Sequence, residues 1–218
     1  MKIKWIGHSA LKLIGSDVVY IDPFLSGNPS ATESLDDVKE ADIVVVTHDH
    51  GDHLGDAFPI CKKTGATLVS IYEIAQKAAD EGITAEMMNI GGSVKVKNTI
   101  VSLVPAFHTA DLGGTPVGAV VEMDGKTVYH AGDTGLSIEM KLIGEMYEPD
   151  IAFLPIDGRF NMTPRLAAKA VELLGVKKVV PFHYNTFPAI ESSPEDFKKF
   201  VGELAEVIIL NPGDTIEI

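Results

Sequence analysis

The residues best suited to chemistry in this sequence are three histidines and two aspartates within six positions, His48-Asp49-His50-Gly51-Asp52-His53. They directly follow an apolar run at 42–47 that predicts a buried strand. Residues two apart in an extended chain project to the same side, so His48 and His50 can bind one metal ion together. Asp52 and His53 follow where the chain would turn toward a helix, and they can face a second cation. Imidazole and carboxylate ligands suit Zn²⁺ best, and Mn²⁺, Fe²⁺ and Ni²⁺ are alternatives.

A solvated, turn-forming loop is the simplest alternative for this segment. Packing is a poor explanation for a dense cluster of histidines and acids after a buried strand, so we favour a metal site. Cys61 is the only cysteine, which excludes a cysteine-cluster zinc site and an internal disulfide. We expect Cys61 to be a small buried hydrophobe.

Two metal ions need more ligands than this segment holds. Three further polar residues, His108, Asp133 and His183, each follow a strand-like run. Taken singly, each is explained as a satisfied core histidine or a turn aspartate. Together, at strand ends where α/β proteins form their sites, they are candidates for the missing ligands.

The elements that must position these residues are short. Apolar and β-branched runs predict strands at 2–6, 11–14, 18–21, 42–47, 86–89, 93–96, 99–104, 117–123, 126–130, 151–154, 178–182 and 207–210. Helices are predicted at 54–64, 72–81, 163–174 and 194–204, the last two starting at Thr163-Pro164 and Ser193-Pro194. Hairpin turns are expected at Gly91-Gly92 and at Asp124-Gly125, the latter of type I′. Strands followed by α/β alternation occur twice, as a coarse similarity between the halves without a sequence repeat.

The composition fits one α/β domain spanning residues 1–218. The chain is 45% hydrophobic, and no low-complexity linker divides it. No apolar run approaches the length of a membrane span and the N-terminus does not resemble a signal peptide, so we expect a cytoplasmic protein. The net charge of −13 disfavours nucleic acid as a partner. A small anionic substrate remains compatible, because bound cations can reverse the field inside one pocket.

The ordered motif set resembles the metallo-β-lactamase superfamily. It comprises the HxHxDH run at 48–53, then His108, Asp133 in YHAGDT, and His183 in PFHYNTFP. With GHS at 7–9 and IDP at 21–23, the chain is closer still to the small metal-dependent hydrolases that are similar to ascorbate-6-phosphate lactonases. This resemblance implies a four-layer αβ/βα sandwich, with two mixed β-sheets face to face and helices on the outer sides.

The resemblance also implies a ligand set and a reaction. The first metal would take His48, His50 and His108, the second would take Asp52, His53 and His183, and Asp133 would bridge both. Two divalent ions, Zn²⁺ foremost, would activate a bridging hydroxide against a small ester, lactone or phosphoester, with Asp52 orienting it or relaying its proton. A bridging aspartate is typical of the thiolester-hydrolase, lactonase and phosphodiesterase branches. His50, where flavodiiron oxidoreductases have glutamate, disfavours redox chemistry.

Several other polar residues are candidates for a supporting role. His8 contacts substrate or supports a ligand, or else is structural. Asp22 supports a ligand histidine or merely starts a turn. Asn185 and Thr186 are candidate substrate contacts, as are Asp157 and Arg159, the latter for an anionic group. For His130 and Trp5 we favour buried, structural positions.

Two rival functions keep the same fold: a phosphodiesterase or nuclease, which the negative charge disfavours, and a non-catalytic metal-binding module, which the complete ligand set disfavours. The expected partner is a small molecule, and neither nucleic acid nor a membrane is expected. Self-association is a family-level expectation to which no residue points.

Overall fold

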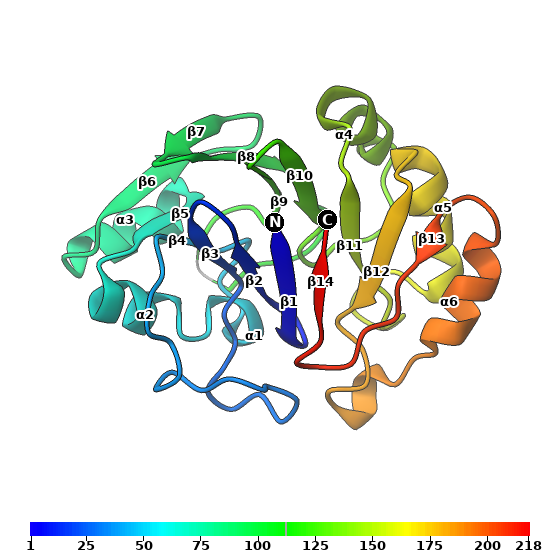
Figure 1. The fold of residues 1–218 in the computed structure, drawn as a ribbon, viewed down its shortest axis with the longest axis horizontal. Coiled ribbons are helices and arrows are strands. Elements are labelled where there is room, and N and C mark those ends of the chain that lie inside the picture. Colours follow the sequence, from blue (N-terminus) through cyan, green and yellow to red (C-terminus); the bar gives the residue numbers. More distant parts are fainter. Residues whose placement is uncertain (112) are drawn as a thin grey trace.

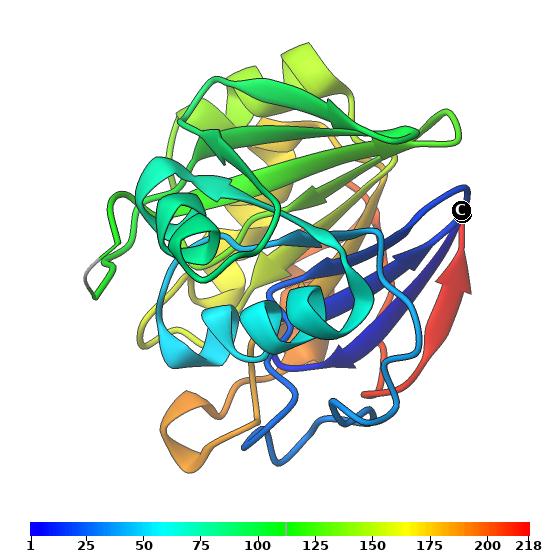
Figure 2. The ribbon, with the colours of Figure 1, turned by 90° about the vertical axis from the view of Figure 1, so that its left-hand side faces the viewer.

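Two seven-stranded β-sheets pack face to face in the computed structural model, which describes residues 1–111 and 113–218. Helices cover the outer faces of both sheets (Figure 1). The view in Figure 2 shows the two sheets as separate layers, one above the other. The α/β sandwich that the family resemblance implied is therefore confirmed.

The first sheet belongs to the N-terminal half of the chain, except for one strand at the C-terminus. Its order is β14 (Thr215–Glu217), β1 (Lys2–Gly7), β2 (Ala10–Ile14), β3 (Val18–Ile21), β4 (Ile43–Val45), β5 (Thr67–Ile71) and β6 (Ala85–Met88). Neighbours from β14 to β3 are antiparallel, and those from β3 to β6 are parallel. Its connecting helices are α1 (Gly51–Leu54), α2 (Ala57–Thr64) and α3 (Tyr72–Asp80).

The second sheet repeats this plan in the C-terminal half. Its order is β7 (Ser93–Val96), β8 (Thr99–Pro105), β9 (Val117–Met123), β10 (Lys126–His130), β11 (Ile151–Pro155), β12 (Lys178–Phe182) and β13 (Glu206–Val207). Neighbours are antiparallel as far as β10 and parallel after it. Its helices are α4 (Glu139–Tyr147), α5 (Pro164–Leu174), the 3₁₀ turn η1 (Pro188–Ile190) and α6 (Pro194–Val201). The coarse similarity between halves is thus a similarity of topology.

The strands at the centre of each sheet are apolar along their whole length. Every residue of β3, β4 and β11 is buried, because helices cover one face of the sheet and the other sheet covers the second. Buried side chains of both sheets join one hydrophobic cluster. This core holds the strand ends, and the loops that follow them, in fixed relative positions.

The capping and turn residues in the sequence correctly predicted the starts of two helices and the position of one turn. The side chains of Thr163 and Ser193 cap α5 and α6 by accepting the N–H groups of Leu166 and Asp196. Asp124 and Gly125 both have positive φ, as the expected type I′ turn requires.

Other expectations were wrong. Gly91-Gly92 does not close a hairpin, because β6 and β7 belong to different sheets. The predicted helix 54–64 is divided at Gly55, whose φ of 39° and approach to Pro23 and Phe24 exclude a side chain. The predicted strand 207–210 is replaced by the two-residue strand β13, which overlaps it only at Val207. The sequence interpretation also missed β5, α4 and β14.

Candidate metal centre

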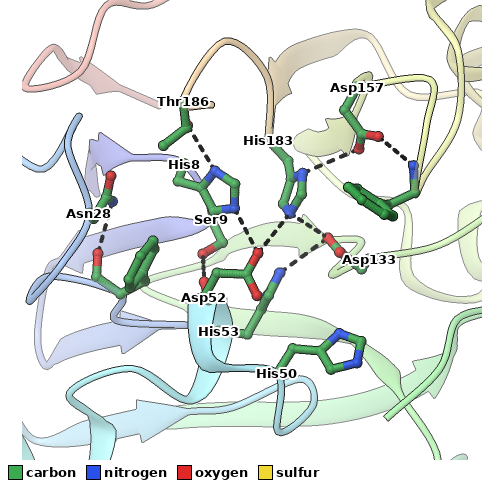
Figure 3. Close-up of polar contacts among 12 residues, drawn as sticks. His8, Ser9, Asn28, His50, Asp52, His53, Asp133, Asp157, His183 and Thr186 are labelled. Atoms are coloured by element: carbon green, nitrogen blue, oxygen red, sulfur yellow. Dashed lines mark hydrogen bonds and ion pairs between the residues drawn. The ribbon is translucent and has the colours of Figure 1, made fainter. Parts of the chain in front are cut away.

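The strand order brings all the candidate ligands to one end of the sandwich. In the first sheet β1, β3 and β4 run in the same direction, so His8, Asp22 and the segment 48–53 follow strands that end at one edge. In the second sheet β8, β10, β11 and β12 do the same for His108, Asp133, Asp157 and His183. The labelled side chains from the two sheets point toward one another in Figure 3.

Three histidines form the first group of donors. His48, His50 and His108 each place one ring nitrogen within 4.8 Å of the others. His48 Nε2 lies 3.0 Å from His50 Nδ1, and the ring centroid of His108 lies 5.3 Å from each of the other two. His48 is buried, whereas His50 and His108 are partly exposed and face the opening.

A second group lies beside it and contains Asp52, His53, His183 and His8, whose donor atoms are also within 4.8 Å of one another. His183 Nε2 is 3.6 Å from Asp52 Oδ2. The side chain of Asp52 is 33% exposed, while those of His53 and His183 are at most 3% exposed. Asp52 is therefore the member of this group that an incoming molecule can reach.

Asp133 lies between the two groups. Its Oδ1 is 3.2 Å from both His53 Nε2 and His183 Nε2, and its Oδ2 is 3.4 Å from His108 Nε2. Gly132 sets this position: its φ is 61°, and a Cβ there would meet the Val117 carbonyl at 2.7 Å. The bridging position that the resemblance implied for Asp133 is compatible with this geometry.

Three buried atoms at this point have no hydrogen-bond partner. They are His53 Nε2, Asp133 Oδ1 and His183 Nε2, which approach one another to 3.2 Å without hydrogen-bond geometry. Buried polar atoms are normally paired, and unpaired ones need an explanation. A cation coordinated by all three satisfies them, so the donor set fits a metal ion.

Supporting carboxylates fix the ligand rings from behind. Asp22 accepts from His53 Nδ1 at 2.7 Å, from Thr47 Oγ1 at 2.6 Å and from the Thr47 amide at 2.8 Å. Asp157 Oδ2 lies 3.2 Å from His183 Nδ1. Each carboxylate contacts the nitrogen that faces away from the cluster, which leaves Nε2 of each ring directed into it.

His8 is held at both ring nitrogens. Its Nδ1 lies 2.8 Å from Thr186 Oγ1, and its Nε2 lies 3.0 Å from Asp52 Oδ2 (Figure 3). Ser9 adds a second contact to the same segment by donating to the Asp52 carbonyl at 2.5 Å. The loop after β1 thus fixes Asp52 in place.

The pKa values of the clustered side chains shift in different directions, so that some are neutral and others are charged at neutral pH. Burial, and then the neighbouring His53, lower the pKa of His48 to about 3; burial and His183 lower that of His8 to about 4. Burial alone would lower the pKa of His183, but Asp133, Asp157 and Asp52 raise it to about 9. Burial is likewise outweighed at the two central acids: the neighbouring imidazoles hold the pKa values of Asp52 and Asp133 far below their usual range. Both carboxylates are therefore ionised at neutral pH, as metal ligands must be.

The structure does not bring every candidate into the cluster. Asn185 turns away, because its Oδ1 accepts the Ser192 amide at 2.8 Å; its neighbour Thr186 makes the contact instead. Arg159 is exposed, with its guanidinium carbon 5.5 Å from the ring centre of Phe160. His130 is a buried strand residue whose nitrogens meet the Ser9 carbonyl and the Gly132 amide.

Two supporting residues escaped the sequence interpretation. Thr47 holds Asp22 and contacts His48 Nδ1 at 3.1 Å, and Asn161 donates to Asp157 Oδ2 at 2.7 Å. Backbone strain is a further signal, although it is visible only in the structure. Seven non-glycine residues among those described have positive φ, and four of them, His8, Asp22, His183 and Asn185, lie in the loops of this site.

Comparisons with known proteins agree with this arrangement. A sequence model of the beta-lactamase superfamily domain matches residues 18–184. A UPF0173 metal-dependent hydrolase of Methanopyrus kandleri is 54% identical over the full length of both chains, and one of Korarchaeum cryptofilum is 49% identical, also over both full lengths. The structure of Igni18, a metallo hydrolase of Ignicoccus hospitalis, superposes with a TM-score of 0.93 at 42% identity, covering 99% of this chain and 97% of the other.

The fold and the donor set thus define a metallo hydrolase of the β-lactamase superfamily. The chain belongs to that superfamily, in the group whose members are named UPF0173 metal-dependent hydrolases. The predicted class of enzyme is therefore confirmed. Among the described residues, no helix is long and apolar enough to cross a membrane.

Proposed function

We propose that this hydrolase uses a dinuclear metal centre to cleave a small ester, lactone or phosphoester. The observation that carries the proposal is the convergence of two donor groups on Asp133, with unpaired buried atoms on three of the converging side chains. One metal ion would be held by His48, His50 and His108, and the other by Asp52, His53 and His183. Asp133 would contact both, since its two oxygens face different groups.

The ligand types favour Zn²⁺, with Mn²⁺, Fe²⁺ and Ni²⁺ as alternatives, because imidazole and carboxylate accept all four. When bound, such ions would acidify a water molecule for use as the nucleophile and would supply positive charge for the oxyanion that develops.

The chain's own residues orient the reactants. The Asp52 side chain is 33% exposed and its Oδ2 is held by His8, so this ionised carboxylate is placed to accept a proton from a bound reactant. Asp22 and Asp157 keep His53 and His183 from rotating. The reaction therefore needs no serine or cysteine nucleophile, and Cys61, whose pKa burial raises to about 12, is not one.

The charge around the opening disfavours the nuclease alternative. In the sequence of the loops 22–32, 47–56, 106–116, 131–138, 156–163 and 183–193, Arg159 is the only lysine or arginine. Binding a nucleic-acid backbone takes several such contacts. A small substrate with at most one negative group fits this opening better.

The test measures bound metal per chain and then turnover of generic phosphodiester, thioester and lactone substrates, with and without chelator. Two metal ions and chelator-sensitive turnover support the proposal. Asp150→Asn, at the opposite end of β11, is a matched control that should behave as wild type. Full metal loading without turnover of any substrate class would contradict hydrolysis and favour the metal-binding module.

A further inference from the structure

Three exposed phenylalanines lie on three different loops that also carry residues of the metal centre. Phe107 directly precedes His108, Phe160 follows Asp157 by three residues, and Phe187 follows His183 by four. Phe107 and Phe160 are each 56% exposed, and Phe187 is 38% exposed. Each of these loops thus presents an aromatic ring to solvent within four residues of a site residue.

The backbone or ring of each phenylalanine is tied to the centre. The Phe107 amide donates to Thr134 Oγ1, next to Asp133, at 2.9 Å. The Phe160 amide donates at 2.7 Å to Asp157, the carboxylate that supports His183. The Phe187 ring stands edge-on to the His8 ring, with centroids 5.7 Å apart. Residues of the site therefore anchor Phe107 and Phe160 through their backbone amides and Phe187 through its ring.

Exposure of these rings to water is unfavourable for the stability of the fold. Each ring left in water forgoes burial worth roughly 25 cal/mol per Å². Scattered exposed hydrophobic residues are ordinary, but apolar groups gathered beside polar, convergent side chains are typical of ligand-binding surfaces. The only lysine or arginine in these loops, Arg159, lies over the ring of Phe160 and does not offset the apolar character of the surface.

We infer that the substrate is a small amphiphilic molecule: an aryl or alkyl group packs on Phe107, Phe160 and Phe187 while its ester, lactone or phosphoester group reaches the metal centre beside Asp52. This inference rests on the proposed function, because it takes the metal centre as the reacting end. It narrows the substrate to a compound with an apolar arm and at most one charge. A sugar-like or multiply charged compound would leave the rings in water.

The direct test uses probes that cannot be hydrolysed. Binding of methyl-, butyl-, hexyl- and octylphosphonate to the metal-loaded protein is measured by calorimetry below their micelle concentrations. We expect the affinity to rise about two- to fourfold per methylene, as for burial of a CH₂ group. Phe160→Ala and Phe187→Ala should flatten this chain-length dependence, with the metal content unchanged. Phe200→Ala removes a ring that is 50% exposed on α6 and should leave the dependence intact.

The outcomes separate this inference from the proposed function. Chelator-sensitive cleavage of short esters, with phosphonate affinity independent of chain length, would overturn the apolar arm and keep the hydrolase. Chain-length-dependent binding with no turnover of any ester, lactone or phosphoester would keep the apolar surface and refute hydrolysis. A dependence that survives all three substitutions, including Phe107→Ala, would overturn the inference. So would variants that change only the oligomeric state in light scattering, since the rings would then form a contact between copies.

Discussion

Asp22 and Asp133 occupy corresponding places in the two halves of the molecule, yet their environments differ. Each follows the strand at which its sheet changes from antiparallel to parallel, β3 for Asp22 and β10 for Asp133. Both oxygens of Asp22 accept hydrogen bonds, from Thr47 and His53. Asp133 Oδ1 has no hydrogen-bond partner and faces two histidines. One framework position therefore provides a support in the first half and a candidate ligand in the second.

The segments after β4 and β11 differ in the opposite sense. The one after β4 carries four of the candidate ligands, His48, His50, Asp52 and His53, whereas the one after β11 provides Asp157, which supports His183. The topology of the sheets does not determine which residues are ligands and which are supports, because the two sheets have matching topologies. At each pair of corresponding positions, the loops therefore determine which residue is a candidate ligand and which one orients a ligand.

The largest expected effect follows from removing Asp133, the proposed bridging residue. Asp133→Ala should lose at least one metal ion per chain and more than about a hundredfold in kcat/KM, since losing a ligand should cost more than losing a supporting contact. The variant should remain folded, because the side chain leaves one oxygen without a hydrogen bond in the native state. Metal analysis and circular dichroism measure the two results. Unchanged metal content would remove Asp133 from the ligand set.

The corresponding change in the first half should give a different result. Asp22→Asn weakens the orientation of His53 and places an amide group among three donors, so metal affinity should fall about 10- to 100-fold. Stability should fall by about 1–3 kcal/mol as well, since a buried donor loses its acceptor. Metal titration should still reach the wild-type stoichiometry at high concentration. If one metal ion were lost at every metal concentration, Asp22 would be as necessary for metal binding as Asp133, and the proposed difference between a support and a ligand would be wrong.

Much of this arrangement could be predicted from the chain alone. Strands at 93–96, 117–123, 126–130 and 178–182 have the predicted bounds, since alternating or continuous apolar runs between turn residues leave little choice. The dense segment 48–53 indicates metal by itself. The roles of His108, Asp133 and His183 depend on the order of motifs along the chain, because single polar residues at strand ends have many explanations.

The remainder depends on tertiary contacts. Helix α4 was missed because its sequence mixes buried Ile143 with exposed Leu142 and Met146, and because Gly144, a poor helix former, is required where α4 packs against Leu174. Thr47 reads as the end of a strand, and only the structure shows that its hydroxyl holds Asp22. The contacts of Asp22 with Thr47 and His53, and of Asp157 with His183, join residues 25 or more positions apart, so no local pattern reveals them.

Asp157 gives a smaller test of the division between coordination and support. Asp157→Asn keeps the oxygen that accepts the amides of Arg159 and Phe160, but it removes the charge beside His183 Nδ1. We expect metal affinity to fall about tenfold, at the low end for a supporting carboxylate. Competition with a chelator of known affinity measures this change, with Asp150→Asn as the control. Unaltered affinity would show that the contact with His183 does not hold the ring.

The smallest effect concerns the loops after β1 and β8, which place His8 and His108 at corresponding positions in the two sheets. His108 belongs to the donor group of His48 and His50, whereas His8 lies in the second donor group and contacts Asp52 and Thr186. If His8 only positions Asp52, His8→Ala should keep the metal content and lower kcat/KM. Thr186→Val should lower kcat/KM only about three- to tenfold, which is the loss of one hydrogen bond to a ring that stays in place. Loss of metal in His8→Ala would instead make His8 a ligand, and the two halves would then resemble each other more than Asp22 and Asp133 suggest.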